Sequence, residues 1–152
     1  EGAAAGDEVA ELLLQDLLPK WGGSWEQATR FAWECANQAP PGSPNPALVV
    51  ILHVERWVDS DQDVRAVFAD PSIRRDVWQA GEQSVMNPAF AGVPGWEYAL
   101  STFALGYSLT EDWPRAKACF ARLGPYAHES GWDYFNQPGE VFAQYRAKAM
   151  AS

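Results

Sequence analysis

Few residues of this chain have the types and spacing that chemistry needs, and an acidic run is the first candidate. It reads DSDQD at positions 59–63, which are the first to fifth positions of a calcium loop, and Asp70 takes the twelfth. However, Val64 stands at the sixth position, where the sharp turn requires glycine, and the twelfth is normally a bidentate glutamate. The alternative is a solvated turn in which Asp59 or Asp61 caps the next helix. We favour that turn, so the sequence predicts no metal site here.

The two histidines are the next candidates. His53 precedes Glu55 by two residues in an expected helix, so their side chains point to different faces and form no acid–base couple. His128, with Glu129 and Asp133, gathers polar groups beside an aromatic segment, and we retain it as a candidate binding residue. A catalytic zinc ion needs three protein ligands, and one histidine per region does not supply them. A histidine satisfied within the fold is the favoured interpretation of both, and we expect no catalytic residue and no cofactor.

Other motifs that carry chemistry are missing from the sequence. No nucleophile elbow, phosphate-binding glycine loop or zinc spacing occurs. The two cysteines, Cys35 and Cys119, fall in expected helices without C-x-x-C spacing. Buried thiols of a cytoplasmic protein are the default for such a pair, with a disulfide between them as the alternative.

Composition limits the partners. The chain has 152 residues, of which 47% are hydrophobic and 20% charged, which suits one domain with a substantial core. Its formal net charge of −9 argues against nucleic acid and against an anionic membrane surface, because both attract clustered Lys and Arg. No stretch reaches the ~18 apolar residues of a membrane span. The eight tryptophans either fill the core or line a groove.

The segment 95–124 organises the rest of the chain. It predicts two amphipathic helices joined by a polar turn at residues 110–112, with Pro114 in a first helical turn and Gly124 as the stop. Apolar side chains recur there at three- and four-residue steps: Ala99, Leu100, Phe103, Ala104 and Tyr107, then Trp113, Ala116, Phe120 and Leu123. The pattern is typical of an antiparallel helical hairpin.

This hairpin resembles one tetratricopeptide repeat, a helix–turn–helix unit of about 34 residues. Small residues of the repeat correspond to Ala104 and Ala116, and its aromatic residues to Tyr107 and Phe120. The match is partial, because His128 stands where the repeat carries its closing proline. The resemblance implies stacked helical hairpins with a concave face that binds protein or peptide.

A second resemblance concerns the N-terminal third. Trp25 and Ala28 repeat the spacing of Trp113 and Ala116, and Pro40 follows at the closing position of a repeat. The surrounding segments are similar to part of uncharacterised bacterial proteins that carry a tetratricopeptide-like domain of unknown function: KWGGSW at 20–25, FA at 31–32 and APPGSP at 39–44. That similarity implies a fold and a bacterial origin, and it implies no reaction.

The remaining segments predict further helices. Periodicity and caps place them at 7–21, 24–38, 45–57, 61–69, 72–85 and 138–149. The run ALVVILHVERWV at 47–58 also suits a buried strand, but its proline start and its length favour a central helix. Residues 1–6 are expected to be a leader, disordered or added by cloning, and 7–152 a single helical domain. The predicted fold is all-α, with antiparallel hairpins stacked as a tetratricopeptide-like bundle or short solenoid.

A non-catalytic protein- or peptide-binding scaffold with an acidic, partly aromatic groove is the favoured function. Its candidate binding residues are Trp96, Tyr107, Trp132 and His128, although each of the three aromatic side chains has a core position as its alternative. The rival is a small-molecule-binding or enzymatic domain with an aromatic-lined pocket, in which His128, Glu129 or Glu97 supplies polar groups. A small immunity or inhibitor protein also fits the acidity, with no motif to support it.

Overall fold

All regular structure in the described part of the chain is helical. The computed structural model describes residues 3–124 and 131–152, which form eight α-helices, three short 3₁₀ helices and no strand. The predicted all-α fold is therefore confirmed. The α-helices are α1 (Ala3–Asp16), α2 (Trp25–Gln38), α3 (Ala47–Asp59), α4 (Val64–Phe68), α5 (Pro71–Gln83), α6 (Trp96–Leu109), α7 (Trp113–Leu123) and α8 (Pro138–Met150). The 3₁₀ helices are η1 (Pro19–Trp21), η2 (Pro88–Phe90) and η3 (Trp132–Tyr134).

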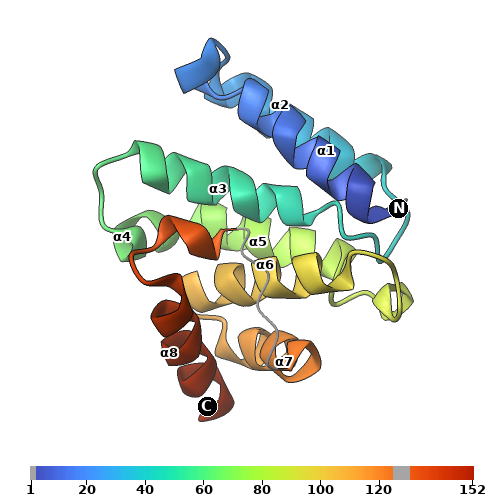
Figure 1. The fold of residues 1–152 in the computed structure, drawn as a ribbon, viewed down its shortest axis with the longest axis vertical. Helices are drawn as coiled ribbons and strands as arrows, with labels where there is room; N and C mark the ends of the chain where they lie inside the picture. Colours follow the sequence, from blue (N-terminus) through green and yellow to red (C-terminus); the bar gives the residue numbers. More distant parts are fainter. Residues whose placement is uncertain (1–2, 125–130) are drawn as a thin grey trace.

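The helices are arranged in layers, from the N-terminal pair at one end of the molecule to the C-terminal helices at the other (Figure 1). The pair α1 and α2 lies at one end, with α2 packed on α3. Next to α3 come α5 and α6, which both contact it. Helices α7 and α8 pack together at the opposite end of the molecule, α7 against α6.

Helices α3 and α6 form the centre of the core. Every residue from 98 to 110 is buried, so α6 has no solvent-exposed face after its first turn. The same holds for residues 47–55 of α3, which confirms the central helix and excludes the strand alternative. A helix that is apolar nearly all round is stable only when other elements surround it, and α3 contacts α1, α2, α5 and α6.

Helix boundaries agree with the capping residues for the most part. The side chain of Ser24 accepts a hydrogen bond from the backbone N–H of Gln27 at 3.1 Å, as expected for the start of α2. At the start of α7 the cap is Asp112, and Gly124 ends that helix with φ of 70°. The prediction for α4 was wrong in detail, because its cap is Asp63 rather than Asp59 or Asp61.

The first helix differs from the prediction at both ends. It begins at Ala3, four residues before the expected start at residue 7, and it ends at Asp16. Proline at position 19 is the reason for the early end, because the residue before a proline is pushed out of helical conformation. Leu18 accordingly has an extended backbone with ψ of 150°, and Pro19 starts the separate turn η1.

Helices α6 and α7 form the predicted antiparallel hairpin. Its two alanines, Ala104 and Ala116, are fully buried. The aromatic side chains of Tyr107 and Phe120 are also fully buried. These four positions therefore serve packing.

The two cysteines are free thiols, so the disulfide alternative is excluded. Burial raises the pKa of the Cys119 thiol, and burial followed by the nearby Glu34 carboxylate raises that of Cys35. Neither group has the depressed pKa of a reactive thiol. Among the described residues, no helix has both the length and the apolar character needed to cross a membrane.

Candidate functional site

The structure places the four residues expected at a binding surface in different surroundings. Trp96 begins α6 and is partly exposed. Tyr107 is fully buried and Trp132 is only 2% exposed, so neither side chain is accessible to a partner in this structure. His128 lies outside the described residues, as does Glu129. The four residues therefore do not form one groove in the part of the chain that the structure describes.

Trp132 belongs to an aromatic cluster at the end of the molecule that holds α7 and α8. Its ring lies 4.9 Å from that of Phe142 and 6.3 Å from that of Phe120, measured between centroids. Its indole N–H donates to the backbone carbonyl of Ser101 at 3.1 Å. A buried tryptophan needs such a partner for its polar edge, so this cluster accounts for Trp132 as a core residue.

A different residue, Glu55, is the centre of the most unusual polar site. Its carboxylate is only 1% exposed, in the second half of the core helix α3. The side-chain amide of Gln15 in α1 donates to Oε2 at 2.5 Å, and the hydroxyl of Tyr134 in η3 donates to the same oxygen. The ammonium of Lys20 in η1 lies 3.6 Å from Oε1. Side chains from α1, η1 and η3, all far from Glu55 in the sequence, therefore converge on one carboxylate.

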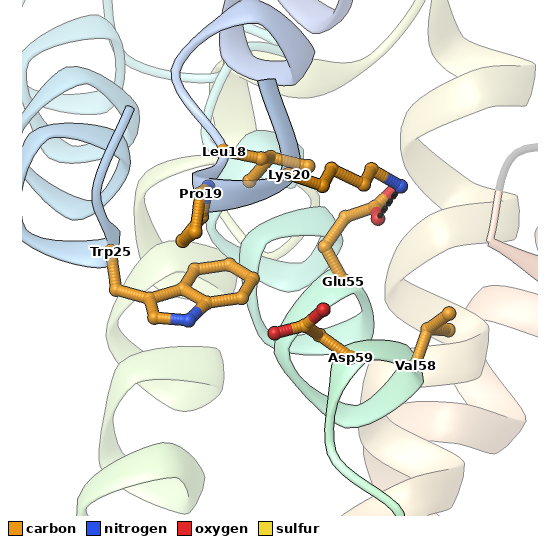
Figure 2. Close-up of a pocket in the computed structure, with 7 residues that line it drawn as sticks. All are labelled: Leu18, Pro19, Lys20, Trp25, Glu55, Val58 and Asp59. Carbon is orange, nitrogen blue, oxygen red and sulfur yellow. Dashed lines mark ion pairs between the residues drawn. The ribbon is translucent and has the colours of Figure 1, made fainter. Parts of the chain in front are cut away.

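The local backbone explains how Lys20 reaches α3. Pro19 starts η1, and Gly22 ends it in the left-handed region with φ of 92°. At Gly23 a Cβ atom would overlap the backbone carbonyl of Leu17, so the return of the chain into α2 requires glycine there. This tight turn places the Lys20 side chain over the end of α3 that carries Glu55 (Figure 2).

A pocket of about 200 Å³ opens between this turn, the start of α2 and the last turns of α3. Its lining residues are Leu18, Pro19, Lys20, Trp25, Glu55, Val58 and Asp59 (Figure 2). Asp59 follows Glu55 by one helical turn, so two carboxylates line the same pocket. Trp25 presents its indole ring on the opposite side, and the guanidinium of Arg56 lies 5.4 Å from the centre of that ring.

Two hydrogen-bond donors and one ammonium group surround the Glu55 carboxylate. Desolvation, followed by the hydrogen bond to Glu55, raises the pKa of Tyr134, so its hydroxyl keeps its proton and donates. A buried carboxylate without partners would be costly, and the hydrogen bonds from Gln15 and Tyr134, together with the Lys20 ammonium, offset that cost. Since both neutral donors act on Oε2, Oε1 is the oxygen available to a cation.

His53 lies on a different side of α3 and pairs with another residue. Its Nε2 is 3.0 Å from the Asp76 carboxylate of α5, and the imidazole is 5% exposed. None of the residues that line the Glu55 pocket is His53 or Asp76. This pair ties α3 to α5, and His53 forms no acid–base couple with Glu55.

Asp63, at the end of the acidic run, and Asp70 act as helix caps. The Asp63 carboxylate accepts from the backbone N–H of Arg65 at 3.1 Å, and that of Asp70 accepts from Ser72 at 2.8 Å. In the part of the chain that the structure describes, no group of three His, Cys, Asp or Glu residues is placed to hold a metal ion. The structure therefore gives these carboxylates a role in helix initiation.

Sequence reasoning missed Glu55 as a site, although one signal was present. It is the only carboxylate in the largely apolar run at 47–58, and a glutamate in such a helix is rarely buried without partners.

Comparisons of the chain with protein-family models, with curated proteins and with solved structures found no match. The function is therefore argued from the geometry of the pocket.

Proposed function

We propose that this chain is a non-catalytic protein- or peptide-binding domain whose docking surface is centred on the Glu55 pocket. The observation that carries the proposal is a pocket lined by a buried carboxylate, a second carboxylate and an indole ring. This combination is acidic and partly aromatic, which is the surface expected from the composition. Aromatic anchors and charged contacts of this kind are typical of protein interfaces.

The size of the pocket favours a side chain of a partner over a complete small molecule. Sites for small molecules usually enclose roughly 300–1,000 Å³, and this pocket has about 200 Å³. That volume suits one side chain from a peptide or protein lying across α2 and α3. The net charge of −9 adds a field that attracts basic partners over a longer range.

An enzymatic or small-molecule-binding domain is the second candidate, supported by the pairing of two carboxylates with Trp25. We place it second because, among the described residues, no Ser, Thr, Cys or His lines the pocket, so the lining supplies no hydroxyl or thiol nucleophile and no imidazole base. Both carboxylates belong to one helix, which leaves no opposing pair for acid–base work across a substrate.

The tetratricopeptide-like relationship is part of the same proposal. Its support is the α6–α7 hairpin, in which the two alanines and two aromatic residues of the repeat pattern are all fully buried. Of the residues first considered as anchors, Trp96 remains a candidate because it is partly exposed. We propose that the domain is cytoplasmic, because its two cysteines are free thiols and thiols are kept reduced in that compartment.

A peptide-library selection tests the proposed function. The purified chain is screened against a random peptide library, and the selected peptides are measured by fluorescence anisotropy. Val58→Arg changes an exposed pocket residue, 43% exposed, and is expected to weaken binding at least about tenfold by filling the pocket and repelling basic groups. Trp78→Arg on α5, where the side chain is 47% exposed and outside the pocket lining, is the matched control and should bind as the wild type does.

The proposed function is contradicted if no peptide is selected. The location of the docking surface is contradicted if the selected peptides bind the Val58→Arg variant as well as the wild type. Circular dichroism of both variants confirms that the fold is unchanged.

A further inference from the structure

We infer that the Glu55 pocket recognises the ammonium or guanidinium group of a basic side chain, and that Lys20 is an internal competitor which this group displaces. The inference rests on the proposed function and names the chemistry of the partner. In the free protein the Lys20 ammonium lies 3.6 Å from Oε1 of Glu55, and both residues line the pocket. The chain itself therefore shows which chemical group this site accepts.

The two oxygens of Glu55 have separate roles. Oε2 accepts hydrogen bonds from Gln15 and Tyr134, which hold the carboxylate in place. Oε1 faces Lys20 at a distance longer than the ~2.7–3.2 Å of a hydrogen bond, so this contact is a loose ion pair. An incoming cation that approaches more closely gains a charge-assisted hydrogen bond which Lys20 does not make.

Lys20 is well suited to leave the site. Its side chain is 46% exposed, whereas that of Glu55 is 1% exposed, so the lysine is the mobile partner of the pair. It lies in the three-residue 3₁₀ helix η1 rather than on an α-helix. Because the Lys20 ammonium makes no hydrogen bond to Glu55 and its side chain is partly exposed, it can move into water. The incoming cation then replaces its charge beside the buried carboxylate.

The remaining pocket residues fit the stem and the charge of a lysine or arginine. Leu18, Pro19 and Val58 are apolar and can pack on methylene groups. Asp59 supplies a second negative charge one helical turn from Glu55, and Trp25 supplies an indole ring. An acidic side chain would meet two carboxylates, and a neutral one would leave Glu55 without a new partner.

The test uses three short blocked peptides that differ in one side chain: lysine, its uncharged analogue norleucine, and glutamate. Each is titrated into the ¹⁵N-labelled protein, and binding is followed on the indole N–H signal of Trp25. The lysine peptide is expected to bind more tightly than the norleucine peptide, and the glutamate peptide not to bind. Added salt should weaken the lysine peptide, because screening acts on exposed charges.

Lys20→Met is the decisive variant, since it keeps an apolar stem and removes the competing charge. The lysine peptide should bind it about twofold to fivefold more tightly, the range expected when a loose ion pair from a partly exposed lysine no longer competes. Lys148→Met, on α8 at the opposite end of the molecule, makes the same change of net charge and should leave the affinity unchanged. Asp59→Asn, at an exposed residue of the pocket, should weaken the lysine peptide by at least about threefold.

The inference is overturned if Lys20→Met weakens the lysine peptide, or if the glutamate peptide binds the wild type and loses binding in Lys20→Met. The second result would make Lys20 a ligand for an anion, and the domain would still be a binding module. It is also overturned if peptides selected from the library carry no basic residue or leave the Trp25 signal unchanged. The proposed function itself fails only if the library yields no binder, so the two failures are distinguishable.

Discussion

At the scale of single residues, one close contact between two helices lies where Gly81 of α5 meets Tyr107 of α6. Tyr107 is fully buried, and a Cβ atom built on Gly81 would overlap its hydroxyl oxygen and lie 2.8 Å from Cζ. Burial, as the main cause, raises the pKa of the Tyr107 phenol, so it stays neutral. Glycine inside a helix lowers helix stability, and here it is needed because it lets the aromatic ring approach the backbone of α5.

Gly81→Ala should therefore destabilise the protein by about 1–3 kcal/mol, the usual cost of overpacking a core. Chemical denaturation measures this as a lower midpoint with an unchanged slope. Gly139→Ala is the control: Gly139 lies in α8 with open space around a Cβ, and alanine there should be neutral or stabilising by up to about 1 kcal/mol.

A second variant separates steric overlap from helix propensity. Tyr107→Phe removes the hydroxyl that meets Gly81, so Gly81→Ala should cost less in that background than in the wild type. Equal costs in the two backgrounds would show that the hydroxyl is not the obstacle.

At the scale of elements, two of the four carboxylates in the segment 59–72 stand just before helices and cap them. Asp63 caps α4 and Asp70 caps α5, each accepting from a backbone N–H two residues later. At the start of α5, Ser72 also donates its hydroxyl to Asp70 at 2.9 Å. Such caps satisfy N–H groups that the first turn of a helix leaves without partners.

Asp70 should make the stability of the protein depend on pH. The backbone N–H of Ser72, and then its hydroxyl, lower the pKa of the Asp70 carboxyl below its usual value. A group whose pKa is lower in the folded state stabilises that state above its ordinary pKa of about 4, and the contribution is lost as pH falls through the folded value. The wild type should therefore exceed Asp70→Asn in stability at pH 7 by more than it does at about pH 2.

Urea denaturation of both proteins at the two pH values measures this difference. Ser72→Ala removes only the hydroxyl donor, so it should reduce the pH-dependent part without abolishing it. A wild-type advantage that is the same at both pH values would contradict this role for Asp70.

At the scale of the whole molecule, burial is distributed unevenly. Helices α3 and α6 are enclosed by other helices over most of their length. Helix α1 lies at the edge of the molecule, and two of its leucines, Leu12 and Leu13, are 66% and 48% exposed. Local opening requires less free energy where fewer apolar contacts are lost.

Native-state hydrogen exchange should reflect this arrangement. Backbone amides of α6 are expected to exchange slowest, through opening of the whole domain, and those of α1 are expected to exchange faster by at least about tenfold. Exchange followed by NMR gives the rates residue by residue. Protection in α1 equal to that in α6 would mean that the N-terminal helix is an integral part of the core.

The sequence by itself was sufficient for the helices and for most of their ends. Helices depend on apolar residues at helical spacing and on caps such as Ser24 and Asp112. Both act between near neighbours in the chain, so a short stretch of sequence is enough to predict their effect. The same local patterns predicted the hairpin of α6 and α7 and the central place of α3. The relation to tetratricopeptide repeats stays a prediction.

Tertiary structure decided which polar and aromatic residues are accessible. The donors to Glu55 include Gln15 and Tyr134, which are 40 and 79 positions away along the chain. Tyr107 and Trp132 have the residue types of binding anchors, yet they lie in the core because neighbouring helices cover them. Contacts between distant segments depend on how whole helices pack, and the spacing of residues within each helix does not specify them. For this reason the Glu55 pocket emerged only from the fold.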